Sequence, residues 1–103
     1  MQIVKSVVGI PIRLTPERTE HIERRHPEMS SEVERILETL SLPYYVQQGD
    51  AGTLIAARHC PKTPLTEKYC CVVYRELSQD DGFIVTAYFA TRPADWRNIV
   101  WKP

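Results

Sequence analysis

The sequence predicts an α+β fold in which two N-terminal helices pack on an antiparallel sheet of four or more strands. Two observations lead to this prediction. Helical periodicity and helix-capping residues are confined to positions 15–42, whereas the second half of the chain is rich in β-branched and aromatic residues separated by turn-forming segments. Helices followed by a run of consecutive strands are typical of α+β domains.

The length and composition are those of a single small domain spanning residues 1–103. The chain has 13 Lys and Arg residues and 13 Asp and Glu residues, so its net charge is zero when histidine is neutral. A non-specific nucleic-acid coat usually carries excess positive charge, so a polyanion would have to be met by a local patch. The three cysteines are an odd number without a C-x-x-C pair, and there is no signal segment or membrane-length apolar run. These features predict a cytoplasmic protein with free thiols and no membrane association.

The first elements expected are a short edge strand ending at Leu14 and a helix from Thr15 to His26. Residues 10–14 alternate in part, which favours a strand that tolerates Pro11. Thr15 can accept a hydrogen bond from the first helical turn, and a proline at position 16 suits the first helical position. The helix should end before Pro27, because a residue that precedes proline is pushed away from helical geometry.

This first helix has an unusual inward face. Ile22 is its only strongly apolar residue. At about 100° per residue, Arg18, Arg25 and His26 lie within roughly 60° of Ile22, and His21 lies at the edge of that arc. A face of imidazole and guanidinium groups around one isoleucine suits a functional site better than a core.

A second helix is expected after a connector at residues 27–29. Ser31 is predicted to cap it, with Glu34 at the spacing of a capping box. Apolar residues then recur at the i, i+3, i+4 and i+7 positions of one face: Val33, Ile36, Leu37 and Leu40. This pattern predicts a structural helix that packs on the sheet.

Four strands are predicted in the second half of the chain. They cover residues 44–48, 53–59, 68–77 and 83–91, with hairpin turns at 49–52 and 78–82 and a stiff loop from Pro61 to Pro64. The strand at 83–91 is expected to be central, with the strand at 68–77 beside it. The tail at 92–103 is expected to pack down as a short closing segment.

Strict alternation in the 83–91 strand would divide its residues between two faces. One face is expected to pack on the helices: Phe83, Val85, Ala87 and Phe89. The other would carry Ile84, Thr86, Tyr88 and Ala90. Thr86 and Tyr88 would then present two hydroxyls side by side, although both are also ordinary strand residues on a solvated face.

The strongest candidates for chemistry are His21 and His26 with Arg25 between them, because imidazole is the natural acid and base near neutral pH. Against this, Glu17 and His21 stand at the spacing of an ordinary helix pair. Arg58 follows a run of small apolar residues and suits either an acid or a phosphate, and Lys68 opens the next strand as a surface residue or a phosphate contact.

No metal and no cofactor are expected. His59 and Cys60, and likewise Cys70 and Cys71, are adjacent in predicted strands. Neighbours in a strand point to opposite faces, so neither pair can chelate one zinc ion. Cys70 and Cys71 are expected to be buried free thiols.

Several short motifs resemble a known nuclease family. They are Thr15-Pro16-Glu17-Arg18, His21-Ile22, Arg25-His26-Pro27-Glu28, the segments 68–73 and 82–88, Thr91-Arg92 and Trp101. This set is similar to the phage- and toxin-associated nucleases of the barnase–EndoU–colicin–RelE-like (BECR) group. The resemblance implies helices on a four-stranded antiparallel sheet and metal-independent RNA cleavage. It maps the helix-motif histidine to His21 and His26 and the strand threonine to Thr86, and it implies RNA and an antitoxin or immunity protein as partners.

The chemistry implied is transesterification by a toxin-like ribonuclease. One of His21 and His26 would deprotonate the ribose 2′-hydroxyl and the other would protonate the leaving oxygen, in an order left open. Phosphate contacts are expected from Arg25, Arg58 and Lys68, while Thr86 and Tyr88 would orient the same oxygens. Two alternatives stay open: ribosome-dependent mRNA cleavage of the RelE type, and a non-catalytic binding module with the same fold.

Overall fold

The computed structural model describes residues 1–61 and 68–103, and in these it contains two α-helices, one 3₁₀-helix and seven strands in one sheet. The helices are α1 (Pro16–Arg25), η1 (Pro27–Met29) and α2 (Val33–Ser41). The strands are β1 (Gln2–Lys5), β2 (Pro11–Leu14), β3 (Tyr45–Gln48), β4 (Leu54–Cys60), β5 (Lys68–Ser78), β6 (Asp81–Ala90) and β7 (Ile99–Trp101). The predicted α+β class is confirmed.

The sheet is larger than four strands and is mixed. Its order is β1-β2-β6-β5-β4-β3-β7, so β5 is the central strand and the prediction that the 83–91 strand would be central is wrong. All pairings are antiparallel except that of β2 with β6, which meet in parallel at Arg13 and Phe83. The chain between β2 and β6 runs through the helices and through β3, β4 and β5, and it supplies the crossover that a parallel pair needs. The all-antiparallel sheet expected from the sequence is therefore wrong.

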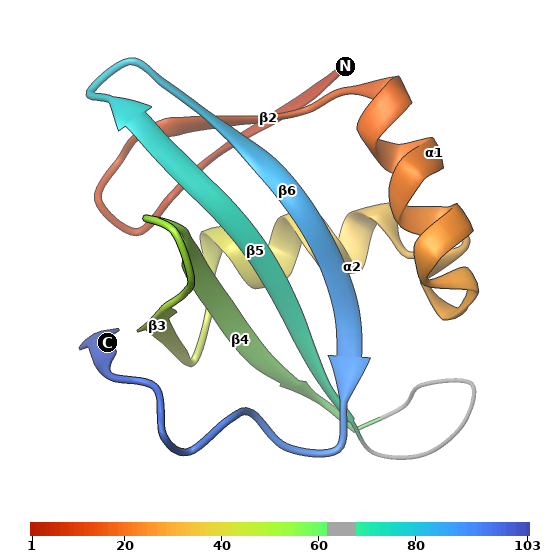
Figure 1. Cartoon of the computed structure of the whole chain (residues 1–103). Helices are drawn as coiled ribbons and strands as arrows, with labels where there is room; N and C mark the ends of the chain where they lie inside the picture. Colours follow the sequence, from red (N-terminus) through yellow and green to blue (C-terminus); the bar gives the residue numbers. More distant parts are fainter. Residues whose placement is uncertain (62–67) are drawn as a thin grey trace.

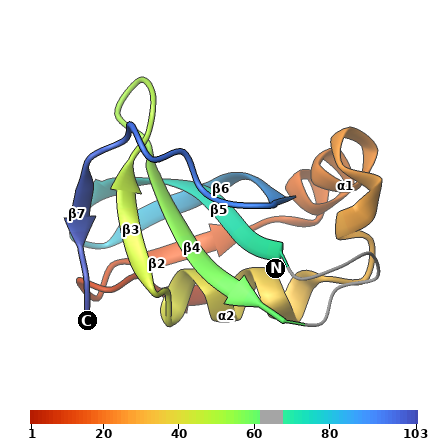
Figure 2. The ribbon, with the colours of Figure 1, turned by 90° about the horizontal axis from the view of Figure 1, so that it is seen from below.

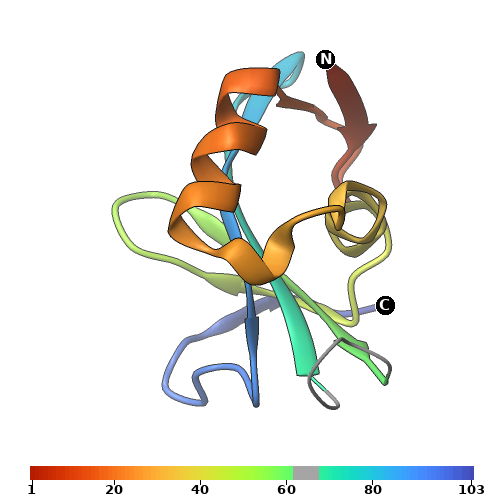
Figure 3. The same cartoon turned by 90° about the vertical axis from the view of Figure 1, so that its right-hand side faces the viewer.

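The helices and the chain after β6 lie on different sides of the sheet. α2 lies behind β5 and β6 in Figure 1, and α1 stands beside β6. The view from below shows the chain between β6 and β7 on the side away from α2 (Figure 2). Figure 3 shows α1 alongside β6 and well separated from α2, which is seen end-on. The main core lies on the helix side, and its largest fully buried residues are Tyr74, Ile12, Leu14, Ile22, Met29, Ile36, Leu40 and Ile84.

α1 begins as predicted, but α2 does not. Thr15 caps α1 by accepting from the backbone N–H of Arg18 at 3.2 Å, and Pro16 occupies the first turn. The capping box predicted from Ser31 is wrong, because Ser31 has φ 64° and the N-cap of α2 is Glu32. The Glu32 carboxylate instead contacts Arg35 Nε at 2.7 Å. The predicted stripe is confirmed, because Ile36 and Leu40 are buried in the core and Val33 and Leu37 pack against it, partly buried.

A β-bulge at Val85 corrects the predicted faces of β6. Tyr74 pairs with Ile84 and Val73 pairs with Thr86, so Val85 is an extra residue on β6. Ile84 therefore faces the helix-side core together with Ala87 and Phe89, whereas Thr86, Tyr88 and Ala90 face the other side as predicted. Phe83 and Val85, which strict alternation placed in the core, belong to neither buried cluster. A bulge reverses the alternation of a strand, which explains the error.

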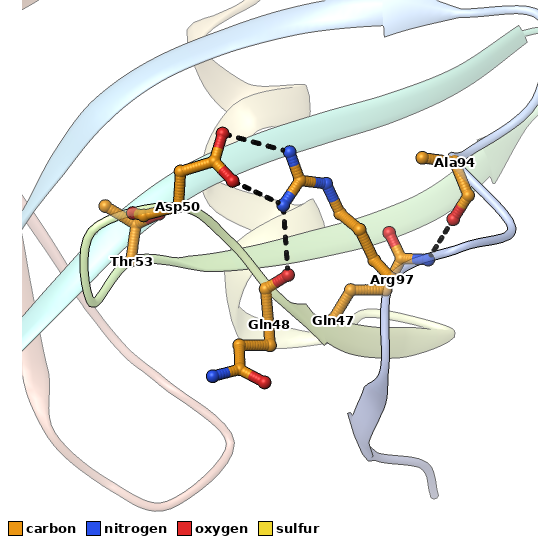
Figure 4. A network of polar contacts seen from close by, with 6 residues as sticks. All are labelled: Gln47, Gln48, Asp50, Thr53, Ala94 and Arg97. Atoms are coloured by element: carbon orange, nitrogen blue, oxygen red, sulfur yellow. Dashed lines mark hydrogen bonds and ion pairs between the residues drawn. The ribbon is translucent and has the colours of Figure 1, made fainter.

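The tail forms a strand and is fastened by polar contacts. β7 pairs antiparallel with β3, which makes it an edge strand. Between β6 and β7, the crossing segment (residues 91–98) is held at two points (Figure 4). Gln47 Nε2 donates to the Ala94 carbonyl at 2.7 Å, and Arg97 donates through both Nη atoms to Asp50 at 3.1 and 3.2 Å. The stiff loop predicted from Pro61 to Pro64 lies, after Pro61, outside the described residues.

Candidate functional site

A cavity between α1 and β6 gathers most of the residues that the sequence singled out. It has a volume of about 230 Å³ and is lined by Arg18, His21, Arg25, His26, Val85 and Thr86. Four of these side chains come from α1 and its C-cap, and Val85 and Thr86 come from the bulge of β6. Two imidazoles, two guanidinium groups and one hydroxyl therefore border a single space.

The packing of α1 explains why this face is polar. Ile22 is its only buried residue, so one isoleucine fixes the side of the helix that turns towards the sheet. Residues three or four positions from it share that side. The carboxylates of α1 do not line the cavity; Glu17 and Glu20 are exposed. The cationic side thus results from a single apolar anchor placed among basic residues.

Arg18 connects the helix to the bulge. Its Nη1 donates to the Val85 carbonyl at 3.3 Å. Arg18 was not among the predicted phosphate contacts, although its position on the arc around Ile22 was a signal that it belonged there. Val85 was placed in the core by alternation, and no local sequence signal marked its carbonyl as part of the site.

The environment of His21 favours the neutral imidazole. Partial burial, followed by the charges of Arg18, Arg25 and Arg24, lowers the pKa of His21 from its ordinary value of 6.5. Desolvation and neighbouring cations both disfavour a protonated ring. His21 is therefore suited to accept a proton near neutral pH.

His26, the C-cap of α1, has different neighbours. Its Nδ1 lies 3.7 Å from a carboxylate oxygen of Glu28, a contact that becomes an ion pair when the ring is protonated. Its ring also lies beside that of Tyr88, with centroids 5.8 Å apart and planes inclined by 37°. The Glu28 carboxylate and the Tyr88 ring thus restrict the orientation of the His26 ring.

Tyr88 borders this site through its ring. Its hydroxyl lies near the thiol of Cys71, the residue opposite it on β5. Burial raises the pKa of Tyr88, and the same cause raises the pKa of Cys71 to about 11. The sequence predicted that the Thr86 and Tyr88 hydroxyls would lie side by side. In the structure Thr86 lines the cavity, whereas the Tyr88 hydroxyl lies near the neighbouring strand β5.

Arg58 and Lys68 are not brought to this cavity. Arg58 lines a separate open cavity of about 670 Å³ beside α2, where it contacts Glu38 at 3.5 Å, donates to the Leu42 carbonyl at 2.7 Å and stacks on Tyr44. Lys68 Nζ donates to the hydroxyl of Thr91 at 3.3 Å. Arg58 shares the helix side of β4 with the buried Ala56, and strand alternation alone does not tell which side of a sheet carries a site.

Within residues 1–61 and 68–103, no three His, Cys, Asp or Glu side chains are close enough to hold one metal ion. Cys60, Cys70 and Cys71 are buried free thiols, as expected for the last two. No helix of the described chain is long and apolar enough to cross a bilayer. Comparisons of the chain with protein-family models, with curated proteins and with solved structures found no match.

Proposed function

We propose that the protein is a metal-independent endoribonuclease that cleaves RNA by transesterification in the cavity between α1 and β6. One observation supports this proposal most: His21 and His26 border the same space as Arg18, Arg25 and Thr86. Two imidazoles supply an acid and a base near neutral pH, and guanidinium groups bind phosphate with a planar fork of donors. The cavity therefore holds the groups that phosphodiester cleavage needs.

The different surroundings of the two histidines support a division of roles between them. His21, with its lowered pKa, acts as the base and takes the proton of the ribose 2′-hydroxyl. The 2′-oxygen forms a bond to phosphorus while the bond from phosphorus to the 5′-oxygen breaks. His26, oriented by Glu28, gives its proton to the leaving 5′-oxygen. The products are a 2′,3′-cyclic phosphate and a 5′-hydroxyl end.

The remaining residues of the cavity stabilise the phosphorane-like transition state. Arg18 and Arg25 contact the non-bridging oxygens, so Arg18 takes the role first expected of Arg58 and Lys68. The Thr86 hydroxyl donates to one of these oxygens. Preorganised donors aimed at developing charge are usually a large part of enzymatic rate enhancement.

The proposal is tested with purified protein, a mixed-sequence RNA and excess EDTA. Cleavage should persist in EDTA, leave 2′,3′-cyclic phosphate ends and spare the same sequence in 2′-O-methyl form. His21→Ala or His26→Ala should each slow cleavage by roughly 10²–10⁴-fold. His59→Phe is the matched control, because His59 lies on β4 and does not line the cavity, and a phenyl ring keeps its contact with Tyr69. Full activity in a variant lacking both His21 and His26 would refute the mechanism.

The same assay separates the two alternatives. Cleavage that requires ribosomes would favour a RelE-like activity, in which basic side chains replace an acid–base pair. Absence of cleavage with free RNA and with ribosomes would leave a binding module. Expression in a bacterial host gives an independent measure, since an active toxin-like nuclease should slow growth and the His26→Ala form should not.

A further inference from the structure

The sheet face opposite α2 carries three tyrosines on three strands, and we call it the tyrosine face: Tyr45 of β3, Tyr69 of β5 and Tyr88 of β6. All three are half-buried. The residues between them are small or β-branched apolar side chains: Ile55, Ala57, Cys71, Val73 and Ala90. The three rings pack on this small cluster, of which Ile55, Ala57 and Cys71 are buried, and each ring remains partly exposed.

The strand register places these rings in order. Tyr88 pairs with Cys71, Cys71 with Ala57, and Ala57 with Tyr45, so the two tyrosines end a row that has two small residues in its middle. Tyr69 lies two residues from Cys71 along β5. With strands about 4.8 Å apart and a rise of about 3.3 Å per residue, positions 69 and 88 are roughly 8 Å apart. This separation allows each ring to meet a different planar group.

The tyrosine face begins where the cationic cavity ends. The Tyr88 ring lies 5.8 Å, centroid to centroid, from that of His26, which lines the cavity. The crossing segment lies on the same side of the sheet as the tyrosine face (Figure 2), where Arg97, paired with Asp50, comes near enough to Tyr88 to affect its ionisation. The cationic cavity therefore borders an aromatic surface, and single-stranded nucleic acids require this combination: cations for the backbone and rings for the bases.

We propose that the tyrosine face binds single-stranded RNA, with the base beside the cleaved phosphate stacked on Tyr88 and the next base stacked on Tyr69. This inference rests on the proposed function, because it takes the phosphate to be held between α1 and β6. Bases in a duplex are stacked on each other and cannot offer their faces to a ring, so the substrate class is single-stranded. A protein partner of the same face is an outcome that the test separates.

Binding is measured by fluorescence anisotropy with a labelled 2′-O-methyl oligonucleotide of mixed sequence, which cannot be cleaved because its nucleophile is blocked. The probe is used single-stranded and in duplex, with inorganic polyphosphate as a base-free competitor. Tyr88→Leu and Tyr69→Leu should each weaken single-strand binding by roughly 5- to 100-fold and leave its salt dependence unchanged. Arg25→Gln should lower the salt slope by about one.

Two controls keep this experiment decisive. Tyr44→Leu removes a tyrosine that is 47% exposed but stacks on Arg58 by the other cavity, and it should bind like wild type. Tyr88→Phe keeps the ring and loses the hydroxyl, so it should recover most of the single-strand binding that Tyr88→Leu loses. If Tyr88→Leu does not fold, Tyr69→Leu and the comparison of single strand with duplex carry the test.

The outcomes distinguish this inference from the nuclease proposal. If Tyr88→Leu and Tyr69→Leu bind and cleave RNA like wild type, RNA binding by the tyrosine face is refuted and the nuclease proposal is unaffected. If the 2′-O-methyl strand binds in a tyrosine-dependent way and RNA is not cleaved, the tyrosine face is supported and the nuclease proposal is refuted. Equal binding of strand and duplex, equal loss in Tyr44→Leu, or no binding at all would overturn the inference and leave this surface to a protein partner.

Discussion

Arg18 donates from Nη1 to the carbonyl oxygen of Val85 at 3.3 Å, and this hydrogen bond joins α1 to the bulge in β6. A bulge leaves one residue out of the regular ladder, which frees its polar groups for other partners. The guanidinium that occupies this carbonyl is also a principal cation near His21. One contact therefore fixes the helix against the strand and helps to set the protonation of the candidate base.

The pKa of His21 should respond to its neighbouring arginines in a defined order. An NMR titration of the wild type should give His21 a midpoint below 6.5. Arg18→Gln should raise that midpoint most, Arg25→Gln less and Arg24→Gln least, following the order of their effects on the ring. A midpoint at or above 6.5 in the wild type would contradict the electrostatic account of the site.

The protonation of His21 should also make the free energy of unfolding depend on pH. Between its lowered pKa and 6.5, the unfolded chain binds more protons than the folded one at this position. The free energy of unfolding therefore rises with pH across this window and falls as pH drops below 6.5. Urea unfolding of wild type and His21→Gln at a series of pH values gives the contribution as a difference. A difference with the opposite slope would show that the folded protein favours the imidazolium.

The two leucines of α2 should differ in their contribution to the core. Leu40 is fully buried, so Leu40→Ala should cost roughly 2–5 kcal/mol of unfolding free energy. Leu37 is only partly buried against the same cluster, and Leu37→Ala should cost less. Chemical denaturation of both variants measures the difference, and equal losses would mean that α2 turns a different face towards the core.

The crossing segment should loosen when its ion pair is removed. The hydrogen bonds and charge of Arg97 lower the pKa of Asp50 from 3.8. Any stability from this pair is present above 3.8 and is lost as pH falls through the lowered pKa. In Arg97→Gln, the Asp50 titration should return towards 3.8, and amides of residues 91–98 should exchange faster. Unchanged amide exchange would mean that Gln47 and the pairing of β7 with β3 hold this segment without the ion pair.

Cys70 and Cys71 should be unreactive until the protein unfolds. Burial is the main reason why the pKa of Cys70 rises to about 12 and that of Cys71 to about 11. The thiolate is the reactive form, so both residues should resist a thiol reagent at mildly alkaline pH in the native protein. All three thiols of the chain should react in denaturant. Rapid labelling of Cys71 in the native state would indicate that the tyrosine face opens.

Local signals predicted local structure well. Thr15 and Pro16 defined the start of α1, and Ile22 among basic residues identified the face that borders the cavity. The turn between β3 and β4 followed from Gly49 and Gly52, of which Gly52 has φ 79°. These features depend on neighbours within one turn of helix or one hairpin, and the sequence contains such neighbours directly.

Features that depend on distant partners were missed. Val85 forms a bulge because of its pairing with β5, and nothing in residues 83–91 marks the extra residue. Arg97 pairs with Asp50 across 47 positions of the sequence, and β7 is only three residues long. Arg58 was assigned to the site from its residue type alone, because the sequence does not show which side of β4 lies against α2. Each error concerns the partner of a residue rather than its chemistry.

The bulge at Val85 also bears on how this strand tolerates insertions and deletions. Loss of a single codon at this position would restore regular pairing of β6 with β5, keeping Ile84 in the core and Thr86 on the opposite face. Such a shortened chain should fold, yet it would lack the carbonyl that receives Arg18. Selection for folding alone would therefore accept β6 with or without the extra residue. Selection for the site would keep the extra residue, because its carbonyl receives Arg18.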